Sequence, residues 1–166
     1  MLVSAVAVAP LAALAVAGCG GGDSSASPGP AKDTRAELPT VDASTNRLGE
    51  ILVDSKGLTL YVFERDKGTK STCFGSCARA WPPLRTKDKP TASGDAKASK
   101  VGTTGRADGA PQVTYNGHPL YLYQGDLKPG EATGQGVNVW GGIWYAVSPA
   151  GKRITKGVPK GGKSGY

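Results

Sequence analysis

Cys19 lies at the end of a stretch that has the composition and spacing of a bacterial lipidation site. Uncharged Leu, Val, Ala, Ser and Pro residues fill positions 2–16, a run too short to span a bilayer comfortably, which is typical of a secretory signal. Val16-Ala17-Gly18-Cys19 then matches the lipobox, where the thiol forms a thioether to diacylglycerol before cleavage. We expect residues 1–18 to be a lipoprotein signal peptide and Cys19 to anchor the chain on the outer face of the bacterial cytoplasmic membrane.

Cys73 and Cys77 are the remaining cysteines, and they are four residues apart. In an exported chain this even pair indicates a local disulfide, although a regular helical turn would hold the two Cβ atoms too far apart. A redox dithiol prefers Cys-x-x-Cys, and a zinc site would need two further ligands. His118 is the single histidine. We expect a structural disulfide, an exposed His118, and no metal or other cofactor; an extracytoplasmic redox- or metal-associated protein using Cys73, Cys77 and His118 is the alternative.

Two carboxylates stand at matching places in a motif that occurs twice. The first copy is Leu60-Tyr61-Val62-Phe63-Glu64-Arg65-Asp66, and sixty residues later comes Leu120-Tyr121-Leu122-Tyr123-Gln124-Gly125-Asp126. The match extends upstream, because Val53 and Gly57 precede Tyr61 as Val113 and Gly117 precede Tyr121. We expect Asp66 and Asp126 to accept backbone N–H bonds at turns after a strand, with a ligand or metal carboxylate as the alternative. We therefore expect the folded part to consist of two copies of one unit, related by a pseudo-twofold.

The sequence has no residue set that would predict catalysis. We find no Ser/His/Asp set, no paired-carboxylate site, no histidine cluster and no nucleotide loop, since the Gly-rich stretch 128–136 lacks a following Gly-Lys-Ser/Thr. The net charge of +7 is spread along the chain without a basic run interleaved with aromatic residues. This distribution argues against nucleic acid as a partner and suits a position near anionic lipid or an anionic cell-envelope polymer.

The elements that would position these residues are short strands. Apolar, β-branched and aromatic runs at 51–53 and 58–63 flank a turn at 54–57, and 112–115 and 118–123 flank Asn116-Gly117, which suits a type I′ turn. Alternation places Leu60 and Val62 on one face and Tyr61 and Phe63 on the other, so both faces are expected to be buried. Further strands are expected at 100–106, 137–140 and 143–147, with a turn at Gly141-Gly142 between the last two.

These elements predict a mainly β protein. We expect a compact antiparallel β domain of two similar hairpin-containing repeats, with at most a short helix around 73–80 that Ser71 or Thr72 caps and Pro82-Pro83 ends. The expected organisation is a flexible tether at 19–46, a tandem-repeat domain at 47–156 (repeat one about 48–85, repeat two about 100–155), and a disordered tail at 157–166.

Together, the motifs resemble a known family. Lipobox, spacer, Leu-Tyr-Val-Phe-x-x-Asp, Cys-x₃-Cys with Trp-Pro-Pro-Leu, and Tyr-Asn-Gly-His-Pro-Leu-Tyr-x-Tyr-x-x-Asp are similar to the bacterial "secreted repeat of unknown function" lipoproteins. The resemblance covers about residues 48–155. It implies a tandem repeat and a surface lipoprotein of undefined molecular role, and it transfers no catalytic residue. Its motif positions here are Tyr61, Phe63, Asp66, Tyr121, Tyr123 and Asp126.

We therefore expect a membrane-anchored extracytoplasmic lipoprotein that is a non-enzymatic binding or structural module of the cell envelope. A third hypothesis is carbohydrate binding by exposed aromatic residues with Asp66 and Asp126 as hydroxyl partners. It requires aromatic side chains on the surface, where the strand pattern predicts burial.

Overall fold

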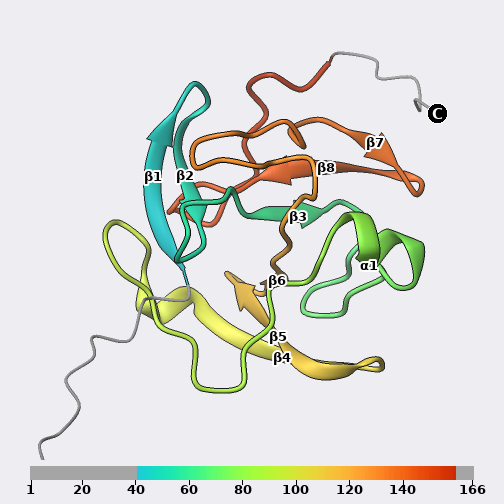
Figure 1. Cartoon of the computed structure of the whole chain (residues 1–166). Helices are drawn as coiled ribbons and strands as arrows, with labels where there is room; N and C mark the ends of the chain where they lie inside the picture. The colour runs from blue at the N-terminus through green and yellow to red at the C-terminus, as the bar shows by residue number, and fades with distance from the viewer. Residues whose placement is uncertain (1–40, 160–166) are drawn as a thin grey trace, which may run out of the picture. The chain divides into compact units, whose positions relative to one another are not determined.

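Short antiparallel strands in three small sheets make up most of the regular structure (Figure 1). The computed structural model describes residues 41–159. β1 (Asp42–Asn46) pairs with β2 (Gly49–Val53), β3 (Tyr61–Phe63) with β8 (Gly142–Ala146) and β8 with β7 (Asn138–Val139), and β4 (Val101–Arg106) with β5 (Gly109–Tyr115) and β5 with β6 (His118–Pro119). The predicted mainly β class, built on two repeat regions with one short α-helix, is confirmed.

The two repeats exchange strands. β3, in repeat one, pairs with β8 at the end of repeat two, where Tyr61 faces Ala146 and Phe63 faces Trp144. The matching segment of repeat two pairs with the end of repeat one: Leu122 N donates to Pro82 O, and other bonds join Leu84 to Leu120 and Gln124 to Ala80. Each motif strand is thus completed by the other repeat.

A pseudo-twofold axis passes between the two motif tyrosines. Tyr61 N donates to Tyr121 O at 2.8 Å, and Tyr121 N donates to Tyr61 O at 2.9 Å. The hairpins that precede the two tyrosines are also equivalent, but with a shift of one residue. Leu60 N donates to Leu52 O, and Leu120 N donates to Val113 O. Val113 therefore corresponds to Leu52 rather than to Val53. The shift follows from the shorter turn at Asn116-Gly117, which adopts the predicted pair of positive φ angles, 49° and 78°.

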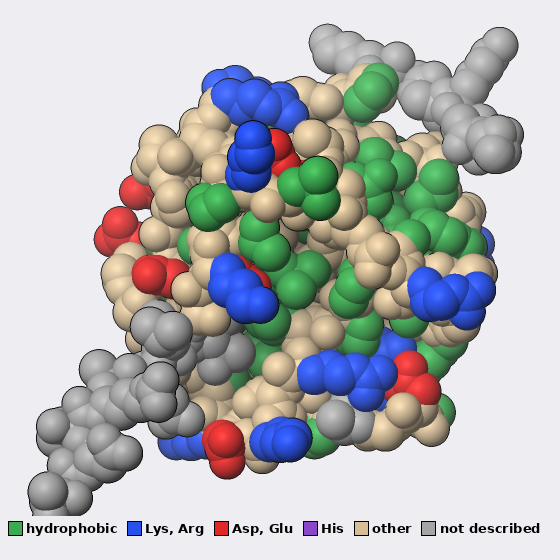
Figure 2. All heavy atoms as spheres, viewed as in Figure 1, with side chains coloured by type: hydrophobic (Ala, Val, Ile, Leu, Met, Phe, Trp, Pro, Cys, Tyr) green, Lys and Arg blue, Asp and Glu red, His purple; other side chains and the backbone are tan. Residues whose placement is uncertain are grey.

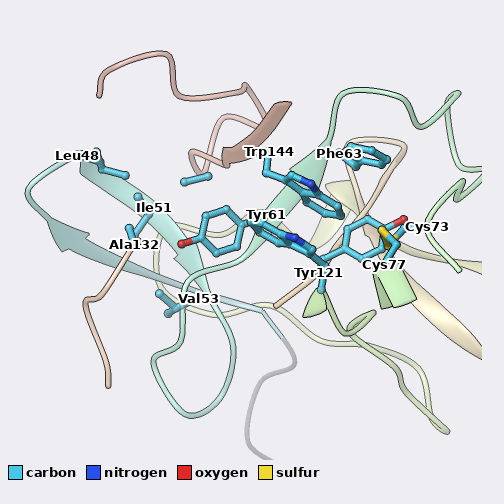
Figure 3. Packing of buried hydrophobic residues seen from close by; sticks show 12 residues of the cluster. Leu48, Ile51, Val53, Tyr61, Phe63, Cys73, Cys77, Tyr121, Ala132 and Trp144 are labelled. Carbon is cyan, nitrogen blue, oxygen red and sulfur yellow. A yellow bond between two sulfur atoms is a disulfide. The ribbon is translucent and has the colours of Figure 1, made fainter. Parts of the chain in front are cut away.

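Both faces of the motif strands are buried, as their alternation predicts. Leu60 and Val62 belong to one hydrophobic cluster, whereas Tyr61 and Phe63 belong to another. The cluster of Tyr61 and Phe63 also holds Tyr121 and both buried tryptophans, and Figure 3 shows it with the disulfide at one end. Each of the two clusters contains residues of both repeats, so neither repeat has a core of its own.

Two boundaries differ from the sequence prediction. Strand β1 lies inside the stretch 19–46 predicted as a tether, so that prediction is wrong for residues 42–46, and Val41 before them is fully buried. The sequence of this strand, DASTN, has no alternation of apolar and polar residues that would predict a strand. Its extended structure depends instead on pairing with β2. Residues 157–159 of the predicted tail are also placed, with Val158 N donating to Thr155 O. The remaining tether and tail, with the signal segment and Cys19, lie outside the described residues.

The turn before β8 is displaced by one residue from its predicted position. Trp140 and Gly141 take the two positive φ angles, 54° and 78°, and Val139 pairs with Gly142 across them. The turn was predicted at Gly141-Gly142 because glycine adopts positive φ without steric cost. Pairing of Asn138 with Ile143 fixes the observed register instead. As a result, a tryptophan occupies a left-handed turn position.

The single α-helix in the described part, α1 (Ser76–Ala80), is shorter than predicted. Gly75 stands at its N-cap, with no side-chain cap hydrogen bond, so the expected capping by Ser71 or Thr72 is wrong. Both side chains bond elsewhere, to Tyr121 and Asp66. Trp81 ends the helix, directly before the predicted stop at Pro82-Pro83.

Candidate functional site

The motif tyrosines and aspartates bond crosswise between the repeats. Tyr61 Oη donates to Asp126 Oδ2 at 2.5 Å, and Tyr121 Oη donates to Asp66 Oδ2 at 2.7 Å. All four residues are buried. The Tyr61 and Tyr121 hydroxyls point to opposite sides of the shared core in Figure 3. In each repeat, therefore, the motif tyrosine donates a hydrogen bond to the other repeat and the motif aspartate accepts one from it.

Each aspartate also closes the loop that follows its own strand. Asp66 Oδ1 accepts the Thr72 backbone N–H at 2.7 Å and its hydroxyl at 3.0 Å, and Asp126 Oδ1 accepts the same two groups of Thr133 at 2.8 and 2.6 Å. The predicted bonds from backbone N–H groups are confirmed. The equivalence of Thr72 and Thr133 was not predicted, because these residues are 61 rather than 60 positions apart. With both carboxylates buried and bonded in this way, neither can serve as the hydroxyl partner of a surface carbohydrate.

Burial changes the acidity of these groups. Desolvation, followed by the bond to Asp126 and its charge, raises the pKa of Tyr61 well above its usual value. Desolvation and the negative charge of Asp66 raise the pKa of Tyr121 in the same way. The pKa of Asp66 is itself raised by desolvation, and the bonds from Tyr121 and Thr72 oppose that rise. Both phenols therefore stay protonated and act as donors, which is a structural role.

Arg106 makes the surroundings of the two crossed pairs, Tyr61–Asp126 and Tyr121–Asp66, unequal. Its side chain is fully buried, and Nη1 donates to Ser71 Oγ at 2.8 Å and to Gln112 Oε1 at 2.7 Å. Ser71 Oγ is also within 2.7 Å of Tyr121 Oη, which connects Arg106 to the Tyr121–Asp66 pair. The guanidinium is paired with Asp108, whose hydrogen bond is the main cause of the raised Arg106 pKa. At the other pair, the Gly134 N–H donates to Tyr61 Oη at 3.3 Å.

Four aromatic rings stack through the centre of the domain. Trp81 and Trp144 lie face to face with 3.9 Å between ring centroids, Phe63 stacks on Trp144 at 4.3 Å, and Tyr123 stacks on Trp81 at 4.2 Å. Tyr61 meets Trp81 edge to face, as Tyr121 meets Trp144. The arrangement obeys the pseudo-twofold, with Trp81 and Trp144 equivalent. The two tryptophans are fully buried, so this stack is the core that the strand pattern predicted.

Cys73 and Cys77 form the predicted disulfide, with 5.3 Å between their Cα atoms. The helix begins only at Ser76, so Cys73 lies in the preceding loop and the spacing problem of a regular helical turn does not arise. Both cysteines are buried against the aromatic core. His118 is partly buried, not exposed as predicted, and pairs with Tyr115 in the β5–β6 hairpin. No group of three or more His, Cys, Asp and Glu residues suited to holding a metal occurs among residues 41–159.

A surface groove lies beside the disulfide, at the end of the aromatic stack. It has a volume of about 400 Å³ and is lined by Phe63, Arg65, Thr72, Phe74, Cys77 and Trp140. Phe74 and Trp140 are 41% and 44% exposed, and they are two of the three exposed large hydrophobic side chains in the described part of the chain. In Figure 2, hydrophobic side chains gather on the side where Figure 1 places β7, β8 and α1. Sequence reasoning missed the groove because it expected the aromatic residues of the strands, Trp140 among them, to pack in the core.

The family model described as "secreted repeat of unknown function" matches the chain twice. Its two matches cover residues 43–85 and 102–148, which together make up more than half of the sequence. The chain belongs to this family. The matched segments correspond to the two strand-exchanging units, and the description agrees with an extracytoplasmic protein. A search of curated proteins and a search of solved structures each found no match.

The secreted-repeat matches end where the exchanged strands end. Residues 80–84, which complete the motif strand of repeat two, fall within the first match, and β8, which completes β3, falls within the second. One family unit thus holds both a motif strand and the strand that completes its partner. Within residues 41–159, the helical segments are too short to cross a bilayer.

Proposed function

We propose that this secreted-repeat protein is a lipid-anchored, extracytoplasmic binding module of the bacterial cell envelope, without catalytic activity of its own. The observation that carries the proposal is the use of the motif side chains. Tyr61, Asp66, Tyr121 and Asp126, which define the motif, are buried and bonded to one another across the repeats. They support a rigid scaffold, so function is left to surface groups such as the groove of Phe74 and Trp140.

Sequence features support the anchor and the partner. The uncharged run at 2–16 followed by Val16-Ala17-Gly18-Cys19 favours lipidation at Cys19, and the net charge of +7 favours an anionic partner in the envelope. Nucleic acid is not the partner we propose, because the positive charge is dispersed along the sequence. The redox alternative gains no support from the site, because Cys73 and Cys77 are buried and bonded to each other.

The anchor is tested by fractionating cells that produce the full chain or Cys19→Ala. We expect the unaltered protein to sediment with membranes, and the mass of its N-terminal peptide to include a diacylglycerol thioether at Cys19. The variant should lose both properties. Membrane association that persists in Cys19→Ala would contradict the lipid anchor, whatever the outcome for binding.

The binding role is tested with protein beginning at residue 20 and isolated cell walls. We expect the protein to co-sediment with the walls and to be released as the salt concentration rises, because exposed charges are screened within about 10 Å at 0.1 M salt. An absence of co-sedimentation at low salt would contradict a role in binding an anionic envelope polymer.

A further inference from the structure

We propose that the groove between Phe74 and Trp140 binds an acidic sugar: a pyranose ring that carries a carboxylate, within an envelope glycan. This inference rests on the proposed binding function and names its ligand class. The ring would stack on the exposed aromatic faces while Arg65 holds the carboxylate. The groove's 400 Å³ lies at the small end of the range of ligand pockets, which suits one or two sugar units rather than a protein segment.

Trp140 is held in the groove wall at a conformational cost. Its φ of 54° lies in the left-handed region, where Asn or Gly is favoured in a type I′ turn and a bulky side chain is unusual. The turn joins β7 to β8, and β8 is fixed by β3 on its other side, so the turn has a rigid base. Strained residues that the surrounding structure maintains cluster at ligand sites. Trp140 belongs to neither hydrophobic cluster, so core packing does not explain a tryptophan at this turn position, and we infer contact with a ligand.

Arg65 is free to bind an anion and is pre-positioned for it. The two ion pairs found among residues 41–159 both use Asp108, so Arg65 has none. Its side chain runs along the β7–β8 turn: a Cβ added at Gly141 would lie 2.8 Å from Arg65 Nη1, and one at Gly142 would lie 2.8 Å from its Cγ. The two glycines therefore make room for the arginine beside Trp140. A guanidinium placed in this way suits the two oxygens of a carboxylate.

Thr72 and Phe74 complete the groove and connect it to the motif. The Thr72 hydroxyl gives its proton to Asp66, so its oxygen is left to accept a bond from a sugar hydroxyl. Phe74 is supported from one side by the Arg106 guanidinium, 4.6 Å from the ring centroid. The buried crossed pair thus orients a polar group of the groove, and the buried arginine orients an aromatic one.

The second repeat lacks this combination. Sixty residues after Arg65 stands Gly125, and the position that follows Thr133 as Phe74 follows Thr72 is Gln135. Gln135 is buried and its amide donates to Ile154 O and Lys156 O. The pseudo-twofold therefore predicts one such site per chain.

The test is calorimetric titration of the protein from residue 20 onward with trigalacturonic acid, beside its fully methyl-esterified form. We expect one site per chain, with the acid bound at least about tenfold more tightly than the ester, because hydrogen bonds to charged groups are the stronger ones. Arg65→Gln should remove that discrimination, and Phe74→Ala should weaken binding at least about fivefold. Leu127→Ala, which removes another exposed hydrophobic side chain, is the matched control and should bind as the unaltered protein does.

Trp140→Asn separates binding from folding, since Asn favours the observed turn. We expect this variant to melt no lower than the unaltered protein and to lose sugar binding. The proposal is overturned if both sugars fail to bind, if Trp140→Asn binds normally, or if polyglutamate or a glycerol-phosphate polymer competes as well as the acidic sugar. Loss of sugar binding with intact co-sedimentation on cell walls would remove this site while leaving the proposed binding function in place.

Discussion

The pairs Tyr61–Asp126 and Tyr121–Asp66 occupy equivalent positions but differ in their surroundings. Asp126 accepts hydrogen bonds from Tyr61 and Thr133, and a glycine N–H and the Thr59 hydroxyl also lie against the Tyr61 phenol. Around Tyr121 the neighbouring hydroxyl is that of a serine, and the positive charge of Arg106 lowers the pKa of Asp66 against the larger effect of burial. The same motif can therefore be supported by very different neighbours. The crossed bond is the constant feature, and the added network lies on the side that carries the disulfide and the groove.

The largest effect is expected from breaking the feature that both sides share. Trp81→Ala and Trp144→Ala each remove half of the central tryptophan stack, and each should lower the free energy of unfolding by about 3–5 kcal/mol. Urea unfolding followed by circular dichroism measures the loss. Trp140→Ala is the control, because Trp140 lies on the surface, and it should change stability far less. Equal losses from all three substitutions would contradict the central role of the stack.

A smaller effect should distinguish the two carboxylates. Asp126→Ala leaves the Tyr61 hydroxyl and both Thr133 donors without their acceptor, and should cost about 3 kcal/mol. Asp66→Ala should cost about 2 kcal/mol, because the Tyr121 hydroxyl retains Ser71 as a partner. Thermal and urea unfolding of the two variants provide the comparison. A greater loss for Asp66→Ala would show that Arg106 and Ser71 depend on that carboxylate more than the geometry indicates.

The third prediction concerns alkaline pH. Because the folded pKa values of Tyr61 and Tyr121 lie above the usual value near 10, the folded state binds more protons than the unfolded state above that pH. Stability must therefore fall as the pH rises past 10, by about 1.4 kcal/mol per tyrosine for each further pH unit. Tyr61→Phe and Tyr121→Phe should each reduce this slope. An unchanged slope in both variants would show that other groups cause the alkaline loss.

Much of the fold follows from the sequence, because local patterns determine it. The Asn116-Gly117 turn, the burial of both faces around Tyr61, the Cys73–Cys77 bond and the equivalence of the two motifs all depend on spacing and residue type. Strand β1 depends instead on its partner, and its polar sequence gave no sign of it. Sequence pattern reports which side chains are apolar more reliably than which segment will pair with which.

The crossed arrangement is the part that the sequence could not reveal. A tyrosine five residues before an aspartate is equally compatible with bonding inside one repeat or between two, and only the exchange of β8 and residues 80–84 decides the matter. The groove was hidden for a related reason. The register between β7 and β8 places Trp140, rather than a second glycine, in the turn. An aromatic residue that was expected in the core is therefore exposed.

The central claim is that the repeats brace each other through exchanged Tyr–Asp pairs. A double-mutant cycle tests it directly, with Tyr61→Phe combined either with Asp126→Ala of the other repeat or with Asp66→Ala of its own. We predict a coupling energy of about 1–2 kcal/mol for Tyr61 with Asp126, and less than about 0.5 kcal/mol for Tyr61 with Asp66. Coupling within the repeat that equals or exceeds coupling between the repeats would contradict the account.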